Sequence, residues 1–299
     1  MKLLLLRAKR GGRHILSTSN LAVFGSPIEH SRSPILHAAA YKVLGLDWSY
    51  GKREVGASAL RDTLDGLDSS WRGLSLTMPL KHEGFLVSGS VDSHGTYTQG
   101  VNTLSFSYVE GFRIVRGFNT DVYGITASLT AAGLSDCAEA TIIGAGATAL
   151  SALVALDELG AERVTVVLRD IAKAQHLTTL AQQLGVELAV TTFGDLAGVQ
   201  PSHAVVSTVP GAAAISLDEL GRHDGAVLLD VAYDVWPSPR AEAWAQRGGV
   251  SVSGLSMLAY QAIKQVRIFS AGVPDQELPN ESEVSAAMFA SVGLNEIGL

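Results

Sequence analysis

The chain has 299 residues, of which 47% are hydrophobic and 17% charged, which is typical of a compact globular protein with room for two domains. Its formal net charge of −7 argues against nucleic acid as a partner and favours a small molecule. The single cysteine, Cys137, excludes an internal disulfide and a multi-thiolate metal site, and the eight histidines show no metal-ligand spacing, so no metal is predicted.

The N-terminal residues do not have the pattern of a signal peptide or a membrane span. The leucines between Met1 and Leu6 are too few for either, and the basic residues follow them instead of preceding them. Residues 1–20 are therefore interpreted as an extension ahead of the first strand. No apolar stretch elsewhere reaches the ~18 residues that a membrane helix needs, so a cytoplasmic protein is expected.

A strand at residues 21–25 and a helix at 35–44 are predicted to open the first α/β unit. The polar turn between them carries Ser31 and Ser33. Because α/β proteins bind ligands at the carboxyl ends of their strands, both hydroxyls are candidates to hold an anionic or polyol substrate. Pro34 suits the first helical position, which makes a helix N-cap the structural alternative for Ser33.

A strand at 48–55, a helix at 58–67 and a strand at 71–76 are predicted next, and the last strand runs into a proline-stiffened segment that ends at Lys81. A lysine held rigidly in a cleft is a candidate acid/base group. The structural alternative is a solvated lysine at the start of a helix.

Asn102 and Asp121 each end a strand-like run, and a hairpin through residues 108–111 is predicted to join the two runs. The functional interpretation of Asp121 is a carboxylate that pairs with Lys81 and hydrogen-bonds a substrate hydroxyl. The structural alternative is an N-cap of the helix that follows.

Residues 141–170 carry the pattern around which the rest of the chain is organised. A β-rich run turns on Gly144, Ala145 and Gly146 into a helix that ends at Gly160, and residues 163–168 form a continuous apolar strand. This is a βαβ unit with G-x-G-x-x-A, whose small residues let the turn approach a pyrophosphate at the helix N-terminus. The predicted dinucleotide site comprises Gly144, Ala145, Gly146, Ala147 and Ala149.

The end of the second strand of this unit bears on the choice of dinucleotide. Leu168 is followed by Arg169 and Asp170, with Lys173 one turn further. Arg169 and Lys173 favour the 2′-phosphate of NADP, whereas Asp170 keeps NAD open because its carboxylate could reach a ribose hydroxyl. Three solvated charges at a strand-to-helix turn are the structural alternative. NADP is the predicted cofactor, with NAD as the alternative.

The β-α alternation continues with strands at 186–192, 204–209, 226–231 and 250–252, followed by helices at 255–269 and 281–292. The predicted fold class is α/β with an N-terminal α/β substrate domain, a Rossmann-type doubly wound dinucleotide domain, and C-terminal helices that return to the first domain. The motifs place the substrate domain at 21–121 and 255–299 and the dinucleotide domain at 122–254.

Six motifs in order, from about residue 21 to the C-terminus, resemble the shikimate dehydrogenase family. They are S-R-S-P at 31–34, L-S-L-T-M-P-L-K at 74–81, V-N-T at 101–103, N-T-D-V-Y-G at 119–124, D-V-A-Y at 230–233 with Pro239 beyond it, and G-L-S-M-L-A-Y-Q-A at 254–262. Six linked motifs are far more specific than any one of them.

The resemblance implies the NADPH-dependent, reversible reduction of 3-dehydroshikimate to shikimate in the chorismate pathway to aromatic amino acids. It further implies a set of site residues: Lys81 and Asp121 as the catalytic pair, Ser31, Ser33 and Tyr233 at the substrate carboxylate, Thr77, Asn102, Gln261 and Ser75 at the ring hydroxyls, Gly254 and Met257 near the nicotinamide, and Thr208 near the diphosphate. Family members occur as monomers and dimers, so a monomer or a homodimer is expected.

The chain also departs from the family pattern. Ser75 stands where the family usually has asparagine, so a shorter side chain or a water is expected to hold one substrate hydroxyl. Leu168-Arg169-Asp170 replaces the usual N-R-T, which leaves NAD-linked quinate/shikimate oxidation as the alternative function. A catalytically silent nucleotide-binding relative and a dehydrogenase of another substrate are further alternatives, against which the retained polar residues and motifs argue.

Overall fold

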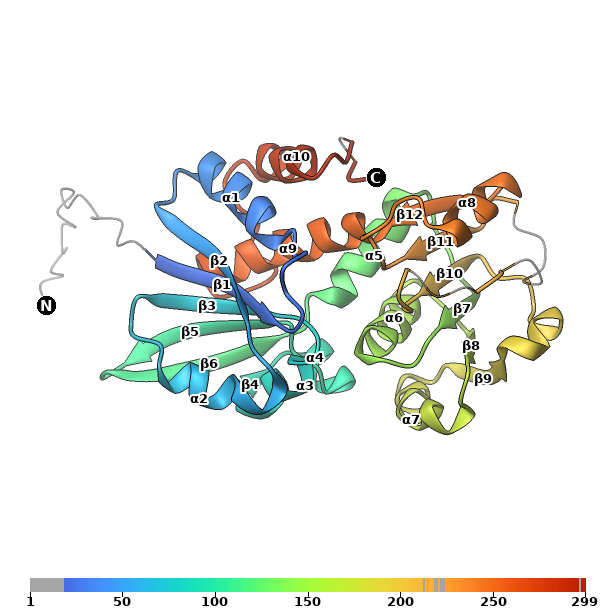
Figure 1. Ribbon diagram of the computed structural model, residues 1–299, viewed down its shortest axis with the longest axis horizontal. Helices are drawn as coiled ribbons and strands as arrows, with labels where there is room; N and C mark the ends of the chain where they lie inside the picture. The colour runs from blue at the N-terminus through green and yellow to red at the C-terminus, as the bar shows by residue number, and fades with distance from the viewer. Residues whose placement is uncertain (1–18, 212, 214, 218–219, 221–223, 296) are drawn as a thin grey trace, which may run out of the picture.

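The computed structural model describes residues 19–299 except 212, 214, 218–219, 221–223 and 296, so residues 1–18 of the predicted extension lie outside the described residues. The described strands form two six-stranded sheets, which lie next to each other along the long axis of the molecule (Figure 1). Helices cover both faces of each sheet. The predicted α/β class with two sheet-based halves is confirmed.

The first sheet is mixed. Its strand order is β2-β1-β3-β5-β6-β4, and the bounds are β1 Ser19–Gly25, β2 Trp48–Glu54, β3 Trp71–Leu76, β4 Ser90–Val91, β5 Thr103–Val109 and β6 Phe112–Phe118. β1 pairs in parallel with both β2 and β3. β5 pairs antiparallel with β3 on one side and with β6 on the other.

Helices cover the two faces of the first sheet with separate cores. On one face α1 (Ser33–Leu44) packs with α9 (Gly254–Ala271) and α10 (Glu281–Ser291), so that C-terminal helices complete the N-terminal sheet as predicted. The other face packs against α2 (Leu60–Asp65) and α3 (Lys81–Val87), and α4 (Ser93–Thr98) lies next to β6. The carboxyl ends of β1 and β3 are thereby fixed between two helical layers.

The second sheet is wholly parallel. Its order is β12-β11-β10-β7-β8-β9, with β7 Glu139–Ile143, β8 Arg163–Leu168, β9 Glu187–Thr192, β10 Ala204–Ser207, β11 Val227–Asp230 and β12 Val250–Ser253. Counted along this half of the chain, the order is the 3-2-1-4-5-6 of doubly wound dinucleotide-binding folds.

Helices bury both faces of the second sheet. Ile142 and Val166 face α5 (Asp121–Ala131), α6 (Ala147–Glu158) and α7 (Gln175–Leu184), which follows the short turn η2 (Ile171–Ala174). Their neighbours Ile143 and Val167 face α8 (Pro239–Gln246) and η3 (Phe193–Gly198). Burial of successive side chains on opposite faces is the reason that the sequence of β8 is an unbroken apolar run.

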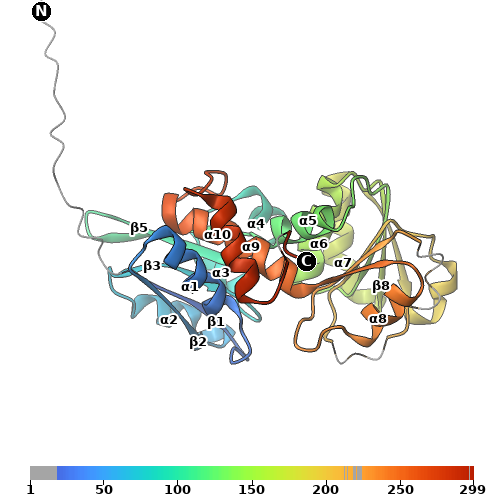
Figure 2. The same cartoon turned by 90° about the horizontal axis from the view of Figure 1, so that it is seen from above.

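Two helices, α5 and α9, connect the halves and pack against each other between the sheets (Figure 2). A Cβ at Gly124 of α5 would lie 2.6 Å from the carbonyl oxygen of Met257, so glycine lets the two backbones meet. A Cβ at Gly254 would lie 2.1 Å from the carbonyl oxygen of Val231, so the start of α9 also requires glycine. These contacts bring the ends of both sheets to one place.

Some predicted boundaries are wrong. β1 begins at Ser19, inside the predicted extension, because Ser19 already pairs with Trp48 of β2. The predicted helix at 58–67 is a turn, η1 (Ala57–Ala59), followed by the shorter α2. α1 begins at Ser33 with Arg32 as its N-cap, so the N-cap interpretation of Ser33 is wrong. Pro34 still lies in the first turn, where its missing N–H costs no hydrogen bond.

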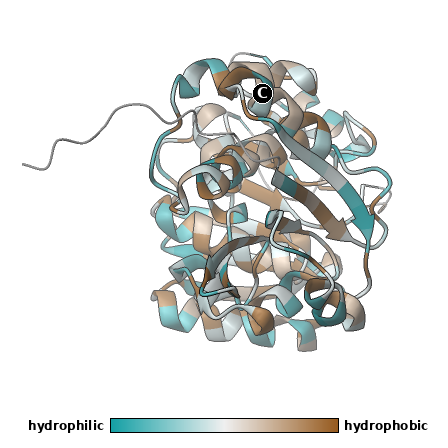
Figure 3. Cartoon of the chain, turned by 90° about the vertical axis from the view of Figure 1, so that its left-hand side faces the viewer, coloured by the Kyte–Doolittle hydropathy of each residue, from teal (hydrophilic) through white to brown (hydrophobic). Residues whose placement is uncertain are grey.

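Hydropathy follows this layering. In Figure 3, brown hydrophobic segments lie on the strands at the centre, and teal and brown alternate along the helices around them. Among the described residues, no helix is long and apolar enough to cross a membrane, and no group of three or more His, Cys, Asp or Glu side chains could hold a metal ion.

Candidate active site

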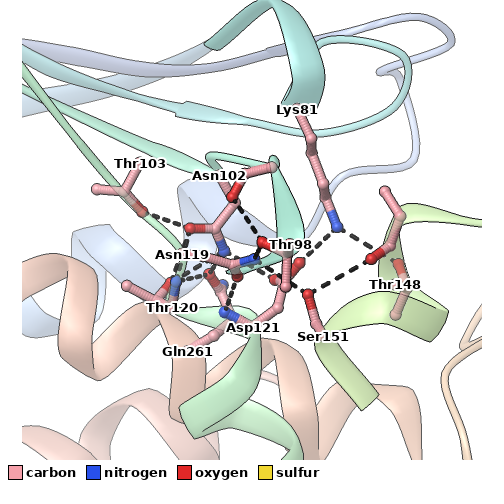
Figure 4. Close-up of polar contacts among 12 residues, drawn as sticks. Lys81, Thr98, Asn102, Thr103, Asn119, Thr120, Asp121, Thr148, Ser151 and Gln261 are labelled. Carbon is pink, nitrogen blue, oxygen red and sulfur yellow. Dashed lines mark hydrogen bonds and ion pairs between the residues drawn. The ribbon is translucent and has the colours of Figure 1, made fainter. Parts of the chain in front are cut away.

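Lys81 and Asp121 form an ion pair between the two halves of the molecule. β3 leads through a cis Met78–Pro79 bond to Lys81, the first residue of α3, and β6 leads to Asp121, the first residue of α5. The Lys81 Nζ lies 2.5 Å from the Asp121 Oδ2, and the side chains are 14% and 7% exposed (Figure 4). The lysine therefore starts a helix without being solvated, and Thr120, not Asp121, is the N-cap residue.

Hydrogen bonds fix the Asp121 carboxylate in this orientation. The Asn102 side-chain amide donates to Asp121 Oδ1 at 2.7 Å, and the Asp121 backbone N–H donates to Asn119 Oδ1 at 3.0 Å. The Asn119 side-chain amide in turn donates to the Thr98 and Ser151 hydroxyls at 2.8 and 3.1 Å. One carboxylate oxygen is thus held by Asn102, while the other faces the lysine.

A cavity of about 170 Å³ adjoins this ion pair. Six of the seven predicted substrate residues line it together with the pair: Ser33, Ser75, Thr77, Asn102, Tyr233 and Gln261. Gly254 and Met257, which the resemblance places near the nicotinamide, line the same cavity. The seventh residue, Ser31, is half-buried in the turn beside it, and its hydroxyl accepts from the Ser33 N–H at 3.4 Å.

Two polar residues of the cavity were not predicted. Gln265 lies one helical turn after Gln261 on α9, and this four-residue spacing on one helix face is the signal that could have identified it. Thr148 is the second residue of α6, within the glycine-loop motif, and the Lys81 ammonium reaches its hydroxyl at 3.4 Å. Both halves of the molecule therefore contribute polar groups around Lys81.

A second cavity, of about 610 Å³, lies along the carboxyl ends of the parallel sheet. Gly144, Ala145 and Gly146 line it at the start of α6. Gly144 has φ of +112°, and a Cβ there would lie 2.4 Å from the Thr208 hydroxyl, so only glycine fits. The Thr208 hydroxyl donates to the Ile143 carbonyl at 2.9 Å and supports the turn from behind. Turn, helix terminus and volume fit a dinucleotide.

The other predicted cofactor residues lie in three settings: on this cavity, at the exposed start of α6 and in the core. Arg169, Asp170 and Lys173 line the cavity. The Asp170 carboxylate accepts from the Ala172 N–H at 3.1 Å, so it caps the η2 turn. Ala147 is exposed at the start of α6, whereas Ala149 is fully buried in the core and packs α6 on the sheet.

Two family models match the chain. Residues 23–104 match the shikimate dehydrogenase substrate binding domain, and residues 128–221 match the shikimate / quinate 5-dehydrogenase model. The chain belongs to the shikimate dehydrogenase family. The first match includes Lys81 and Asn102, the second includes the glycine turn and Arg169, and Asp121 and Gln261 lie outside both.

Relatives of known structure or name share most of this shikimate dehydrogenase family member's length. The chain is 30% identical over 271 residues to the shikimate dehydrogenase (NADP(+)) of Methanothermobacter thermautotrophicus, which is 87% of this chain and 94% of the relative. A shikimate 5-dehydrogenase from Mycobacterium fortuitum is 40% identical, with 90% and 97% coverage and a TM-score of 0.77. The Thermus thermophilus shikimate 5-dehydrogenase in complex with NADP(H) and shikimate is 28% identical, with 92% and 100% coverage and a TM-score of 0.74.

Proposed function

We propose that this shikimate dehydrogenase family member catalyses the NADPH-dependent, reversible reduction of 3-dehydroshikimate to shikimate in aromatic amino acid biosynthesis. The observation that carries this proposal is the buried Lys81–Asp121 pair in a small polar cavity that both halves of the molecule line. The names of the relatives, which include NADP(+) and shikimate, support the proposed substrate and cofactor, and the glycine-turn cavity of this chain fits a dinucleotide.

The side chains of the cavity are complementary to the carboxylate and the ring hydroxyls of the proposed substrate. Ser33 and Tyr233 line one part of it, with Ser31 in the adjoining turn, and their hydroxyls would donate to the substrate carboxylate. Burial raises the pKa of the Tyr233 phenol above its ordinary value, so the phenol is a hydrogen-bond donor at neutral pH. Thr77, Asn102 and Gln261 would hold ring hydroxyls.

The ion pair has the geometry for proton transfer at the reacting oxygen. Bound NADPH supplies the hydride. The Lys81 ammonium would give a proton to the carbonyl oxygen as it becomes a hydroxyl, and its charge would stabilise negative charge that builds on that oxygen. Asp121 holds the ammonium and offsets the cost of burying it. In the oxidation direction, the lysine takes the proton back.

Shikimate oxidation is expected to rise with pH. Each turnover releases one proton, so the ratio of ketone to alcohol at equilibrium shifts about tenfold per pH unit toward the ketone, and the step that gives up this proton is favoured as pH rises. Initial rates between pH 6 and 10 check this. A flat rate profile would indicate that a step other than proton transfer, such as cofactor release, limits turnover.

Arg169 is expected to select NADP over NAD. Within the described residues no hydrogen bond or ion pair occupies its guanidinium, and it lines the cofactor cavity with Lys173. Because a charge-assisted bond to a phosphate would be lost, Arg169→Ala should raise the KM for NADP⁺ about 10- to 50-fold and leave that for NAD⁺ within about twofold. Arg163→Ala, at the opposite end of β8, is the matched control. Equal losses with both cofactors would contradict the assignment.

Initial rates with shikimate or quinate, each with NADP⁺ or NAD⁺, test the proposed function. Shikimate with NADP⁺ should give the highest kcat/KM. Faster turnover of quinate with NAD⁺ would overturn the proposal in favour of a quinate/shikimate enzyme, and no turnover with any pair would favour a silent nucleotide-binding relative. Asp170, the residue that keeps NAD open as the alternative, caps a backbone turn with Oδ1, which leaves its second carboxylate oxygen able to accept from a ribose hydroxyl, so these rates also test the NAD alternative.

The domain division and assembly belong to the proposal as well. We assign substrate binding to residues 21–121 and 255–299 and dinucleotide binding to 122–254; the separate sheets at Ser19–Phe118 and Glu139–Ser253 support this division. Because this chain belongs to the shikimate dehydrogenase family, we propose a cytoplasmic location and a monomeric or homodimeric assembly. Light scattering on the purified protein distinguishes the two assemblies.

A further inference from the structure

Ser75, the residue that departs from the family's usual asparagine, is reached by a tyrosine from the edge of the first sheet. Ser75 lies on β3 and lines the substrate cavity. Tyr50 lies on β2, beyond β1 in the sheet order, and its hydroxyl donates to the Ser75 hydroxyl at 2.6 Å. The aromatic side chain thus spans the width of a strand to reach a residue of the substrate cavity.

The hydroxyl proton of Ser75 is already used in a hydrogen bond to another side chain of the protein. The Ser75 hydroxyl donates to the side-chain oxygen of Gln265 at 2.8 Å. The Gln265 amide group is oriented by its own donation to the Thr103 hydroxyl at 2.9 Å and the Asn102 carbonyl at 3.3 Å. A hydroxyl has one proton and two lone pairs, so Ser75 keeps one lone pair that Tyr50 does not use. Ser75 can therefore offer the cavity an acceptor and no donor.

Tyr50 is held in place by His37. The two rings are stacked with centroids 3.8 Å apart and an angle of 7° between them, and the buried His37 imidazole also bonds Tyr41 and Gln265. Burial lowers the pKa of His37 to about 3 and raises that of the Tyr50 phenol, so neither group changes its charge near neutral pH. The direction of the hydrogen bonds is therefore constant over the working range.

We propose that Tyr50 is a positioning residue that, through Ser75, fixes an acceptor for one ring hydroxyl of the substrate. An asparagine at position 75 would present both a donor and an acceptor, whereas the Tyr50–Ser75 pair accepts only. The site then requires a hydroxyl at the ring position facing Ser75 and disfavours a ketone, ether or fluorine there. This inference rests on the proposed function.

Kinetics of Tyr50→Phe test the role of the tyrosine. Loss of its hydroxyl should raise the KM for shikimate about 5- to 10-fold, leave kcat within about twofold and leave the KM for NADP⁺ unchanged, because the contact is the same in the ground and transition states. Tyr41→Phe removes a hydroxyl from the same aromatic cluster, and among the described residues the hydrogen bond of that hydroxyl is to the His37 ring, not to Ser75. This control should keep the wild-type KM.

Two further measurements separate positioning from a general effect on folding. Ser75→Ala should raise the KM, and adding Tyr50→Phe to it should raise the KM no further, because Tyr50 acts through Ser75. Among shikimate analogues that lack one ring hydroxyl each, the analogue without the hydroxyl that faces Ser75 should show the same KM with wild type and Tyr50→Phe.

An unchanged KM in Tyr50→Phe, equal losses in Tyr50→Phe and Tyr41→Phe, or additive losses with Ser75→Ala would overturn this inference. Shikimate turnover by the wild-type protein is measured alongside. Its absence would overturn the proposed function and this inference with it, whereas normal wild-type turnover with any of the three results above overturns this inference alone.

Discussion

Replacing Lys81 with alanine is expected to lower kcat for shikimate oxidation by about 10³-fold, with a smaller change in the KM for shikimate. General acid–base groups contribute about 10²- to 10⁴-fold, and Lys81 is the one Lys, Arg or His side chain among the described residues that lines the substrate cavity. Lys81→Arg keeps the positive charge, but an arginine side chain stays protonated and is therefore a poor proton acceptor. We expect kcat of this variant to remain at least about 10²-fold below wild type. Steady-state rates with saturating NADP⁺ measure both effects.

The control for this variant is another lysine in a similar setting. Lys264 on α9 has a side chain that is 14% exposed, as that of Lys81 is, and it pairs with Asp275 at 2.8 Å, but it lines neither the substrate nor the cofactor cavity. Lys264→Ala should keep kcat within about twofold of wild type. Near-normal turnover by Lys81→Ala, with NADP⁺ binding intact, would rule out the proposed mechanism.

Asp121→Asn is expected to lower kcat by about 10²- to 10³-fold and to raise the KM for shikimate. The amide keeps the size of the side chain and its contact with Asn102, but it removes the negative charge that holds the Lys81 ammonium at 2.5 Å. Because the lysine then loses its orientation, both proton transfer and the contact with the reacting oxygen suffer. Steady-state rates in both directions measure the loss.

A double variant distinguishes a pair that acts as a unit from two separate contributions. Lys81→Ala with Asp121→Asn should be no slower than Lys81→Ala alone, because residues that work together show non-additive losses. Asp275→Asn, which removes the partner of Lys264, is the matched control and should leave kcat unchanged. Losses that multiply in the double variant would show that Asp121 acts independently of Lys81.

The fold could be predicted well where apolar residues and glycines follow a clear pattern along the sequence. The βαβ unit at 141–170, the parallel sheet and the return of the C-terminal helices could be predicted because buried parallel strands are continuous apolar runs and glycine marks the turns. Element ends were less predictable. The start of β1 at Ser19 depends on pairing with Trp48, and the start of α1 at Ser33 depends on the geometry of the preceding turn.

The site could be predicted where a motif places a residue at the end of a strand. Lys81 and Asp121 follow β3 and β6, as predicted. Asn102 was predicted to end a strand, but it immediately precedes β5, and it joins the other two because β5 runs antiparallel to both β3 and β6. Tyr50 and Gln265 reach Ser75 from an edge strand and a distant helix, and no local pattern marks that meeting. Sequence position alone also does not distinguish Ala149, buried in the core, from the exposed Ala147.

The most direct test of the central claim is a crystal structure of the protein with shikimate and NADPH, a combination in which both partners are already reduced and cannot react. We predict the shikimate carboxylate beside Ser33 and Tyr233, the hydroxyl that undergoes oxidation within hydrogen-bond distance of Lys81 Nζ, and the nicotinamide against Met257. Shikimate bound with Lys81 and Asp121 out of contact, or a nicotinamide outside the cavity that Gly254 and Met257 line, would contradict the assigned site.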